Sequence, residues 1–192
     1  MKPLILILLT FATGLVVPGA EPVPLKDKTL VVWVSPANLT QRGGSVLTID
    51  DGESHFDGII FGEIAPRKWM PGSDFHHRTQ AAQGDWPEET AATNAFVQIA
   101  ITYKDRQVTA YRNGQLYAQY TMANPPLAFG PLSVAVIGMR HLDQGDDARF
   151  AGAIDDARIY DQALTVEQIA ALKPNEPSEP KPAHRGAGHE HR

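Results

Sequence analysis

The chain has 192 residues, a formal net charge of −5 at pH 7 and no cysteine. The negative charge and the lack of a basic cluster argue against a nucleic-acid surface, which needs concentrated lysine and arginine. The lack of cysteine excludes a disulfide framework, a lipobox cysteine and a thiol nucleophile. The 16 glycines and 15 prolines suit an all-β chain with many turns.

The first twenty residues predict export. Lys2 precedes apolar runs at residues 4–9 and 11–17, and small residues follow at 18–20, which is the pattern of a secretory signal peptide. An uncleaved anchor is the alternative, although the apolar run is short for a membrane span. The expected divisions are a signal peptide at 1–20, a short linker at 21–28, one folded domain at 29–173 and a disordered Pro- and His-rich tail at 174–192. The expected location is secreted or periplasmic, with no membrane span after signal cleavage.

Alternating apolar residues predict a series of β-strands. Residues 96–121 read as three successive antiparallel strands, and Asn113-Gly114 favours a two-residue type I′ hairpin turn between the last two. Residues 55–64 are apolar on both faces, which predicts a central strand. Further strands are expected at residues 29–34, 45–50, 133–139 and 150–160.

Two features mark the end of the domain. Ile154 and Ala157 have opposite parity in an alternating strand, so an extra residue near Asp155-Asp156, a β-bulge, is needed to return both to one face. A capping-box spacing at the start of residues 165–172 predicts one short amphipathic helix.

The order of four motifs is informative: FVQIAITY, then VTAYRNGQL, then FAGAIDDARIYDQAL and the closing TVEQIAAL. This order resembles the laminin-G-like domains of the concanavalin A-like lectin/glucanase superfamily over residues 29–172. The resemblance implies an all-β fold, a two-sheet antiparallel jelly-roll sandwich with one short C-terminal helix. Relatives usually begin with further strands, so it also implies that one sheet lacks an edge strand or that a partner supplies it.

Residues 65–93 show no regular period, and an irregular segment of this length is usually functional or disordered. Its aromatic residues argue against disorder. We expect this segment, with the polar loop after residue 139, to form a wet rim suited to a saccharide or a peptide. Burial of the aromatic side chains is the alternative. The candidate ligand-binding residues are Arg67, Trp69, Phe75, His76, Arg78, Trp86, Arg140 and His141.

One candidate metal ligand follows from the resemblance. Relatives often direct a carboxylate from the position of Asp155 to a structural Ca²⁺, an ion that takes oxygen ligands. The alternative is that Asp155 caps the backbone of the bulge. His76 and His77 are adjacent and point to opposite faces of an extended chain, which does not favour joint binding of one metal.

Catalysis has little support in the sequence. Asp57 and Glu63 share a face but lie about 20 Å apart on an extended strand, whereas glycoside hydrolysis needs carboxyl groups about 5 to 9.5 Å apart. We therefore expect an exported, non-catalytic binding module whose partner is a glycan. An envelope protein is the alternative partner, in a protein–protein or assembly domain, and a glycoside-active enzyme is the third hypothesis.

Overall fold

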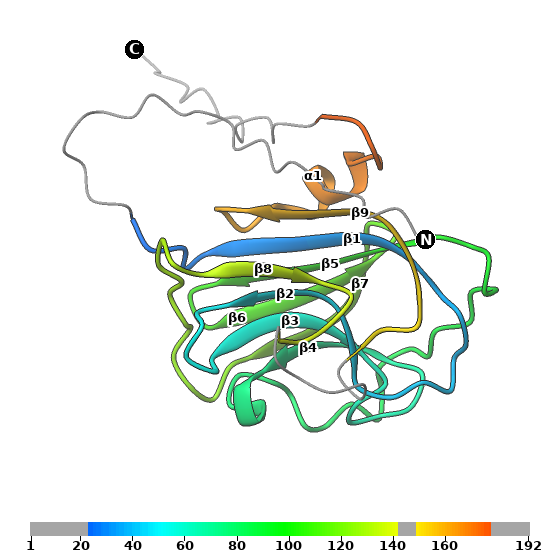
Figure 1. The fold of residues 1–192 in the computed structure, drawn as a ribbon, viewed down its shortest axis with the longest axis horizontal. Helices are drawn as coiled ribbons and strands as arrows, with labels where there is room; N and C mark the ends of the chain where they lie inside the picture. The colour runs from blue at the N-terminus through cyan, green and yellow to red at the C-terminus, as the bar shows by residue number, and fades with distance from the viewer. Residues whose placement is uncertain (1–22, 142–148, 178–192) are drawn as a thin grey trace, which may run out of the picture.

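The structure is a computed structural model that describes residues 23–141 and 149–177. Two antiparallel sheets face each other in a sandwich, with strand orders β7-β6-β5-β1-β9 and β4-β3-β2-β8 (Figure 1). The expected jelly-roll class is confirmed, whereas the expected signal peptide and most of the expected tail lie outside the described residues. The strands are β1 Lys28–Pro36, β2 Gly44–Asp50, β3 Phe56–Phe61, β4 Trp69–Ser73, β5 Val97–Lys104, β6 Gln107–Arg112, β7 Gln115–Thr121, β8 Val134–Ile137 and β9 Gly152–Tyr160.

The core lies between the sheets. It is built from alternate residues of the strands, because successive side chains of a strand point to opposite faces. Each fully buried Val, Leu, Ile or Phe stabilises the fold by roughly 1.5–3 kcal/mol. Buried members include Leu30, Val32, Val34, Ile59, Phe61, Ile99 and Ile101.

The short helix α1, Val166–Ala171, packs on the outer face of the five-stranded sheet (Figure 1). Ile169 is fully buried there in one cluster with Val31 and Ala100. The capping box is confirmed, because the Thr165 side chain accepts from the backbone of Gln168 and the Gln168 side chain accepts from the backbone of Thr165.

Two local predictions are confirmed, one by the register of β1 with β9 and one by backbone angles. Trp33 of β1 pairs with Asp156 and Val34 pairs with Ile154, so Asp155 is the extra residue of a β-bulge. Asn113 and Gly114 have φ values of 50° and 72°, the positive pair that a type I′ turn requires.

The expectation of an irregular segment from residue 65 to 93 is wrong over its first part. Trp69–Ser73 forms β4, which pairs with β3 and places Pro71 opposite Ile59. Proline lacks a backbone N–H and is therefore tolerated in a sheet mainly at an edge, and β4 is an edge strand. β3 is consequently an inner strand, as predicted, and all six of its residues are buried.

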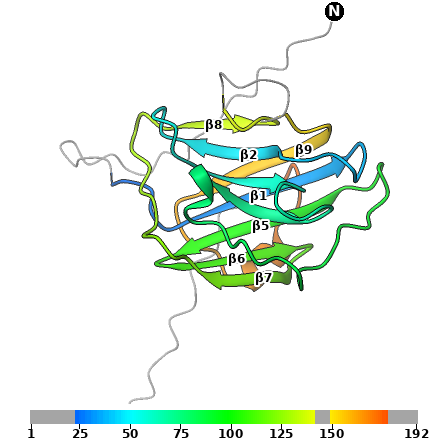
Figure 2. The ribbon, with the colours of Figure 1, turned by 90° about the horizontal axis from the view of Figure 1, so that it is seen from below.

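The edge strands lie on opposite sides of the sandwich. Figure 2 shows β8 and β9 on one side of the sandwich and β7 on the opposite side. After β4, a 3₁₀ turn η1, Asp74–His76, begins the long connection that leads to β5. This connection carries four of the eight candidate ligand-binding residues: Phe75, His76, Arg78 and Trp86.

Candidate functional site

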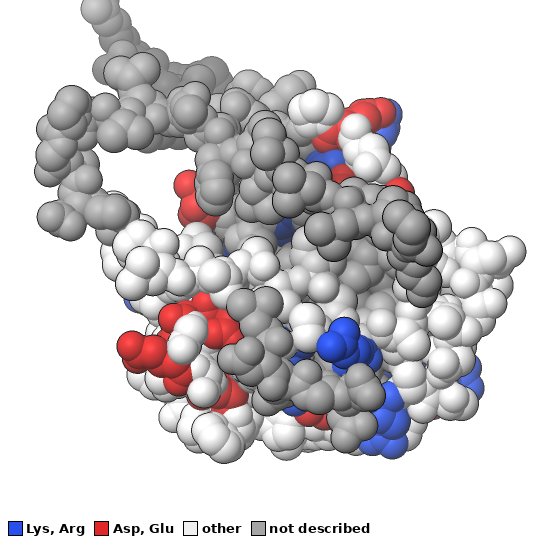
Figure 3. All heavy atoms as spheres, viewed as in Figure 1, with Lys and Arg blue, Asp and Glu red and all other residues white. Residues whose placement is uncertain are grey.

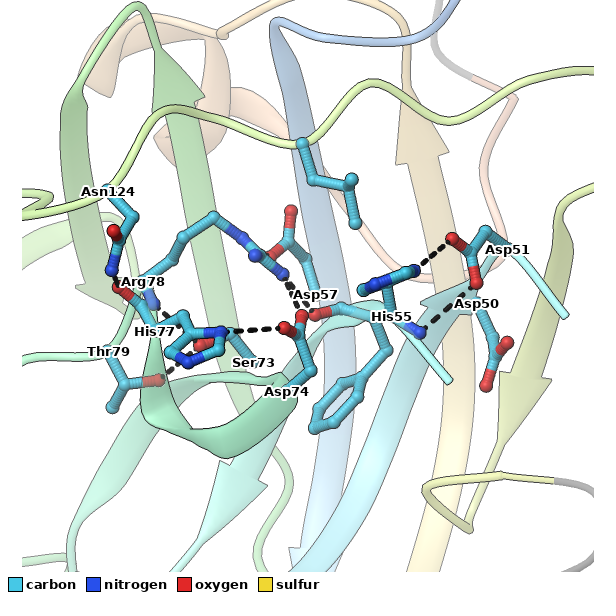
Figure 4. Close-up of polar contacts among 12 residues, drawn as sticks. Asp50, Asp51, His55, Asp57, Ser73, Asp74, His77, Arg78, Thr79 and Asn124 are labelled. Atoms are coloured by element: carbon cyan, nitrogen blue, oxygen red, sulfur yellow. Dashed lines mark hydrogen bonds and ion pairs between the residues drawn. The ribbon is translucent and has the colours of Figure 1, made fainter. Parts of the chain in front are cut away.

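The turn after β4, which we call the Phe75 turn (residues 73–78), is anchored by Arg78. The Arg78 guanidinium donates to Asp57 Oδ1 at 2.9 Å and to Asp74 Oδ1 at 2.5 Å, and its backbone N–H donates to Ser73 Oγ at 2.9 Å. Figure 4 shows Arg78 lying between the two aspartates, with His77 on the other side of Asp74. Arg78 is buried, so the prediction that it contacts a ligand is wrong.

Lys28 continues this ion-pair network into the second sheet. Its Nζ lies 2.9 Å from Asp57 Oδ2, and both side chains are almost completely buried. The ammonium also lies 4.5 Å from the ring centroid of Tyr103 and 4.9 Å from that of Phe129. Burial lowers the pKa of Lys28, and the neighbouring Asp57 offsets only part of that effect. The network therefore joins β1 of one sheet to β3 of the other.

Phe75 is presented to solvent by an unusual backbone. Its side chain is 85% exposed, and both Phe75 (φ 46°) and His76 (φ 58°) lie in the left-handed region. Non-glycine residues in that region cost of order 1–3 kcal/mol and persist only where the surroundings enforce them. The His77 ring lies 5.7 Å from the Phe75 ring, so an aromatic surface with imidazoles beside it faces water.

Glu63, just after β3, brings together two of the predicted residues. Its Oε1 accepts from Arg140 Nη2 at 2.7 Å, and its Oε2 lies 3.4 Å from His76 Nε2. Arg140 also donates to the carbonyl of Gly43 at 2.8 Å, and its guanidinium lies 5.8 Å from the Phe56 ring centroid. Glu63 therefore links Arg140 to His76 of the Phe75 turn.

His141 contacts Phe56, the ring that also lies near the Arg140 guanidinium. Its ring meets the Phe56 ring edge to face at 4.8 Å, and its Nδ1 contacts Asp50 Oδ2. Together these contacts define the candidate site as Phe75, His76 and His77 with Glu63, Arg140 and His141. Four of its residues were predicted from the sequence: Phe75, His76, Arg140 and His141.

Trp69 is a clear correction. Its side chain is fully buried in the main core, and its indole Nε1 donates to Glu89 Oε2 at 2.8 Å. It is therefore not available to a ligand, and the alternative of burial holds for this residue. The edge strand β4 turns Trp69 inward because its neighbours in the register are buried residues of β3, Phe61 among them.

Trp86 lies in the long loop between β4 and β5, and Arg67 lies between β3 and β4. Trp86 is half-buried, stacked on Tyr120 at a ring distance of 6.1 Å and edge to face with Tyr117. Arg67 is partly exposed, with its Nε 3.4 Å from Glu88. A ligand-binding role for Trp86 and Arg67 stays a prediction.

Sequence reasoning missed the buried charges that fix this loop. Glu89 is fully buried and accepts from Trp69 and from Arg112, and Lys68 Nζ donates to the carbonyls of Gln83 (2.6 Å) and Gly84 (2.8 Å). A charged residue in an irregular segment is normally predicted to be exposed to solvent, so no local pattern indicates that these two are buried. Their partners lie far away in sequence and meet them only in the folded chain.

Asp155 is exposed, and its Oδ2 accepts from the Asn175 side chain at 3.1 Å. The adjacent Asp156 accepts from the Asn175 backbone N–H at 2.8 Å and pairs with Arg158. Within residues 23–141 and 149–177, the one group of three carboxylate or imidazole ligands that converge is Asp51, Glu53 and His55, on the β2–β3 connection. Asp155 is not part of it, and Ca²⁺ binding at Asp155 stays a prediction.

Charge is unevenly distributed on the face drawn in Figure 3. Acidic side chains gather at its left, over the end of β2 and β3, and basic side chains gather at its lower right. Asp51, in the β2–β3 connection at this end of the sandwich, accepts from His55 Nδ1 at 2.7 Å.

In the part of the chain that the structure describes, no helix is long and apolar enough to cross a membrane.

Comparison with known proteins identifies the family. The model of the concanavalin A-like lectin/glucanases superfamily matches residues 12–170, and the chain belongs to this family. No curated protein sequence matches the chain.

Three solved structures share the fold at low sequence identity. Domain 4 of a GH43 extracellular arabinanase from Geobacillus stearothermophilus, in complex with arabinotriose, has a TM-score of 0.55 and 20% identity, and the match covers 77% of this chain and 66% of that one. The CBM40 of a Ruminococcus gnavus IT-sialidase, bound to α2,3-sialyllactose, has a TM-score of 0.53 and 13% identity over 77% and 83%. A Trypanosoma rangeli sialidase has a TM-score of 0.51 and 18% identity over 76% of this chain but only 22% of its own.

Proposed function

We propose that this protein is an exported, non-catalytic carbohydrate-binding module that recognises a glycan at the Phe75 turn. The observation that carries the proposal is the 85% exposed ring of Phe75, held outward by a backbone with two consecutive positive φ angles. Strained backbone of this kind clusters at binding sites. The apolar CH face of a sugar ring can cover an aromatic ring, and this is the surface that Phe75 offers.

The groups around Phe75 suit the hydroxyl rim of a sugar. His76 and His77 each hold one ring nitrogen against a carboxylate, Glu63 and Asp74 respectively, and are about half exposed. Imidazole nitrogens can donate to or accept from hydroxyls, and the Arg140 guanidinium adds further donors. Two of the similar structures, the arabinanase domain and the CBM40, hold oligosaccharides, which supports the same ligand class for this chain.

A binding role is favoured over catalysis because the nearby carboxylates serve ion pairs. Asp57 is buried against Lys28 and Arg78, and Glu63 is engaged by Arg140 and His76. A retaining or inverting glycosidase needs two carboxyl groups that flank the scissile bond. The signal-peptide pattern of the first twenty residues supports the exported location.

The test is a glycan array that includes arabinotriose and α2,3-sialyllactose, probed with the wild-type protein and with Phe75→Ala. We expect the variant to lose at least about tenfold in affinity, which is about 1.4 kcal/mol. Leu116→Ala is the control, because Leu116 is another large exposed apolar side chain, at 63%, in β7. Equal binding by wild type and Phe75→Ala would refute the proposal.

An assembly domain is the second candidate, and one observation favours it. β8 is the edge strand of its sheet, and Val134 and Ile137 within it are each 40% exposed. Exposed edge strands can pair with a strand from another chain. Light scattering of the purified protein, alone and mixed with envelope extract fractions, distinguishes the candidates, since a monomer that binds glycans supports the first.

A further inference from the structure

The ion-pair network behind Phe75 connects three parts of the fold. Lys28 lies in β1, Asp57 in β3, and Arg78 and Asp74 in the Phe75 turn. The Arg78 Nη2 also donates to the carbonyl of Phe56 at 2.8 Å. A single guanidinium thus ties the turn to the β3 carboxylate, to the β3 backbone and to the other end of the turn.

Stability alone does not account for such a network. Four charges are held in a region where their side chains are at most 6% exposed. Desolvation of buried ion pairs can equal or exceed their attraction, and apolar replacements of similar volume are often neutral or stabilising. What the network does provide is geometry, because a planar guanidinium bonds its partners in fixed directions.

We propose that Arg78, held by Asp57 and Lys28, is a positioning residue that keeps the Phe75 turn in its strained, ligand-ready conformation. The inference rests on the proposed function, because it assigns Arg78 to the same glycan site. Arg78 lies directly after the Phe75–His77 segment, and Asp74 lies directly before it, so their contact closes the turn across both positive-φ residues. Without that closure the backbone of Phe75 and His76 would relax to negative φ and the Phe75 ring would leave its outward position.

Two variants test the role. Arg78→Lys keeps the charge but cannot bond Asp57, Asp74 and the Phe56 carbonyl in the same geometry. Asp74→Asn keeps an acceptor oxygen and the side-chain shape, so it is a milder variant that folds if Arg78→Lys does not. We expect hydrogen exchange at the amides of His77, Arg78 and Thr79 to become at least about tenfold faster in Arg78→Lys, as for the loss of one charge-assisted bond. Binding on the glycan array falls at the same time.

Arg112→Lys is the matched control. Arg112 pairs with the buried Glu89 at 2.7 Å and fixes the later part of the same loop, away from the Phe75 turn. It should lower the melting temperature while leaving the exchange of the three amides and the array signal unchanged. The double variant Phe75→Ala/Arg78→Lys should bind no more weakly than Phe75→Ala, because Arg78 acts through Phe75.

The outcomes separate the two proposals. If Phe75→Ala weakens array binding but Arg78→Lys and Asp74→Asn change neither binding nor amide exchange, the positioning role is refuted and the glycan site stands. If Phe75→Ala binds like the wild type, the glycan site is refuted, and unchanged amide exchange in Arg78→Lys would then refute the closure of the turn as well. Additive losses in the double variant would show that Arg78 acts independently of Phe75 and would also refute the inference.

Discussion

The Trp69 indole donates a hydrogen bond of 2.8 Å to Glu89, a completely buried carboxylate of the long loop between β4 and β5. The same carboxylate accepts from Arg112 Nη2 at 2.7 Å and from the backbone N–H groups of Thr90 and Ala91. One side chain therefore connects edge strand β4, strand β6 and the loop between β4 and β5. These contacts fix the irregular connection to strands of both sheets.

Glu89→Gln should destabilise the protein strongly. The amide group would place donors against donors and leave the Arg112 guanidinium without its counter-charge, and breaking a buried pair costs about 3–5 kcal/mol. Chemical denaturation measures the loss. Glu88→Gln is the control. The Glu88 side chain is 54% exposed and makes one exposed ion pair, at 3.4 Å from Arg67, so the free energy of unfolding should change by less than about 0.5 kcal/mol. Similar losses in both variants would contradict the role of Glu89.

Trp69→Ala should unfold part of the sandwich without acting on recognition directly. Emptying a buried aromatic site costs about 3–5 kcal/mol of stability. Trp69→Phe keeps most of the packing and removes the donor to Glu89, so it should cost less and leave glycan binding intact. A folded Trp69→Phe variant that lost array binding would restore the ligand-contact hypothesis that the burial of Trp69 contradicts.

Stability should fall in acid, through two carboxylates. Burial alone would raise the pKa of Glu89, but the bonds from Arg112 and Trp69 outweigh it, so the pKa lies below its ordinary 4.5. Burial alone would also raise the pKa of Asp74. The hydrogen bond and the charge of Arg78 outweigh that effect, so the pKa lies below its ordinary 3.8. A lowered folded-state pKa contributes stability that is present above the ordinary value and is lost as the pH falls through the folded value.

Melting temperature measured against pH checks this prediction. The wild-type curve should decline below about pH 4.5, the ordinary value for Glu89. Glu89→Gln and Asp74→Asn should each flatten that decline, because each removes one of the titrating groups. Parallel curves for the wild type and both variants would show that other carboxylates control acid unfolding.

The bulge aspartate can be tested for calcium. The contact between Asp155 and the Asn175 side chain predicts that Asp155→Ala lowers the melting temperature by the same small amount in excess Ca²⁺ and in EDTA. If Asp155 holds a Ca²⁺ ion instead, calcium must raise the wild-type melting temperature, because a ligand of the native state stabilises it, and Asp155→Ala must abolish the rise.

Gly114→Ala should be destabilising for two reasons. The φ of 72° is strained for any L side chain, and a Cβ atom would meet the Ala170 Cα and Cβ of helix α1 at 2.8 Å. The helix would have to move away from the β6–β7 turn, so the loss should exceed the roughly 1–3 kcal/mol of backbone strain alone. Gly84→Ala, which has open space and no positive φ, is the control in a thermal melt. Equal melting temperatures for the two variants would contradict the contact with α1.

The sequence predicted the local features with short-range causes. The β-bulge at Asp155 followed from parity, the type I′ turn from Asn113-Gly114 and the capping box of α1 from spacing. It did not predict β4, because Pro71 reads as a strand breaker until the strand is known to lie at an edge. The sequence correctly named four residues of the candidate site: Phe75, His76, Arg140 and His141. It also named Trp69 and Arg78, which are buried.

The sequence by itself determined the class of fold, since alternation, turn residues and capping act within a few residues of one another. Only the tertiary structure decided which aromatic rings face water and which charges lie inside. Trp69 and Phe75 are six residues apart and equally apolar, yet one is fully buried and the other 85% exposed. That difference arises from pairing with β3 for Trp69 and from the Arg78 network for Phe75, and such long-range contacts have no signature in the local sequence.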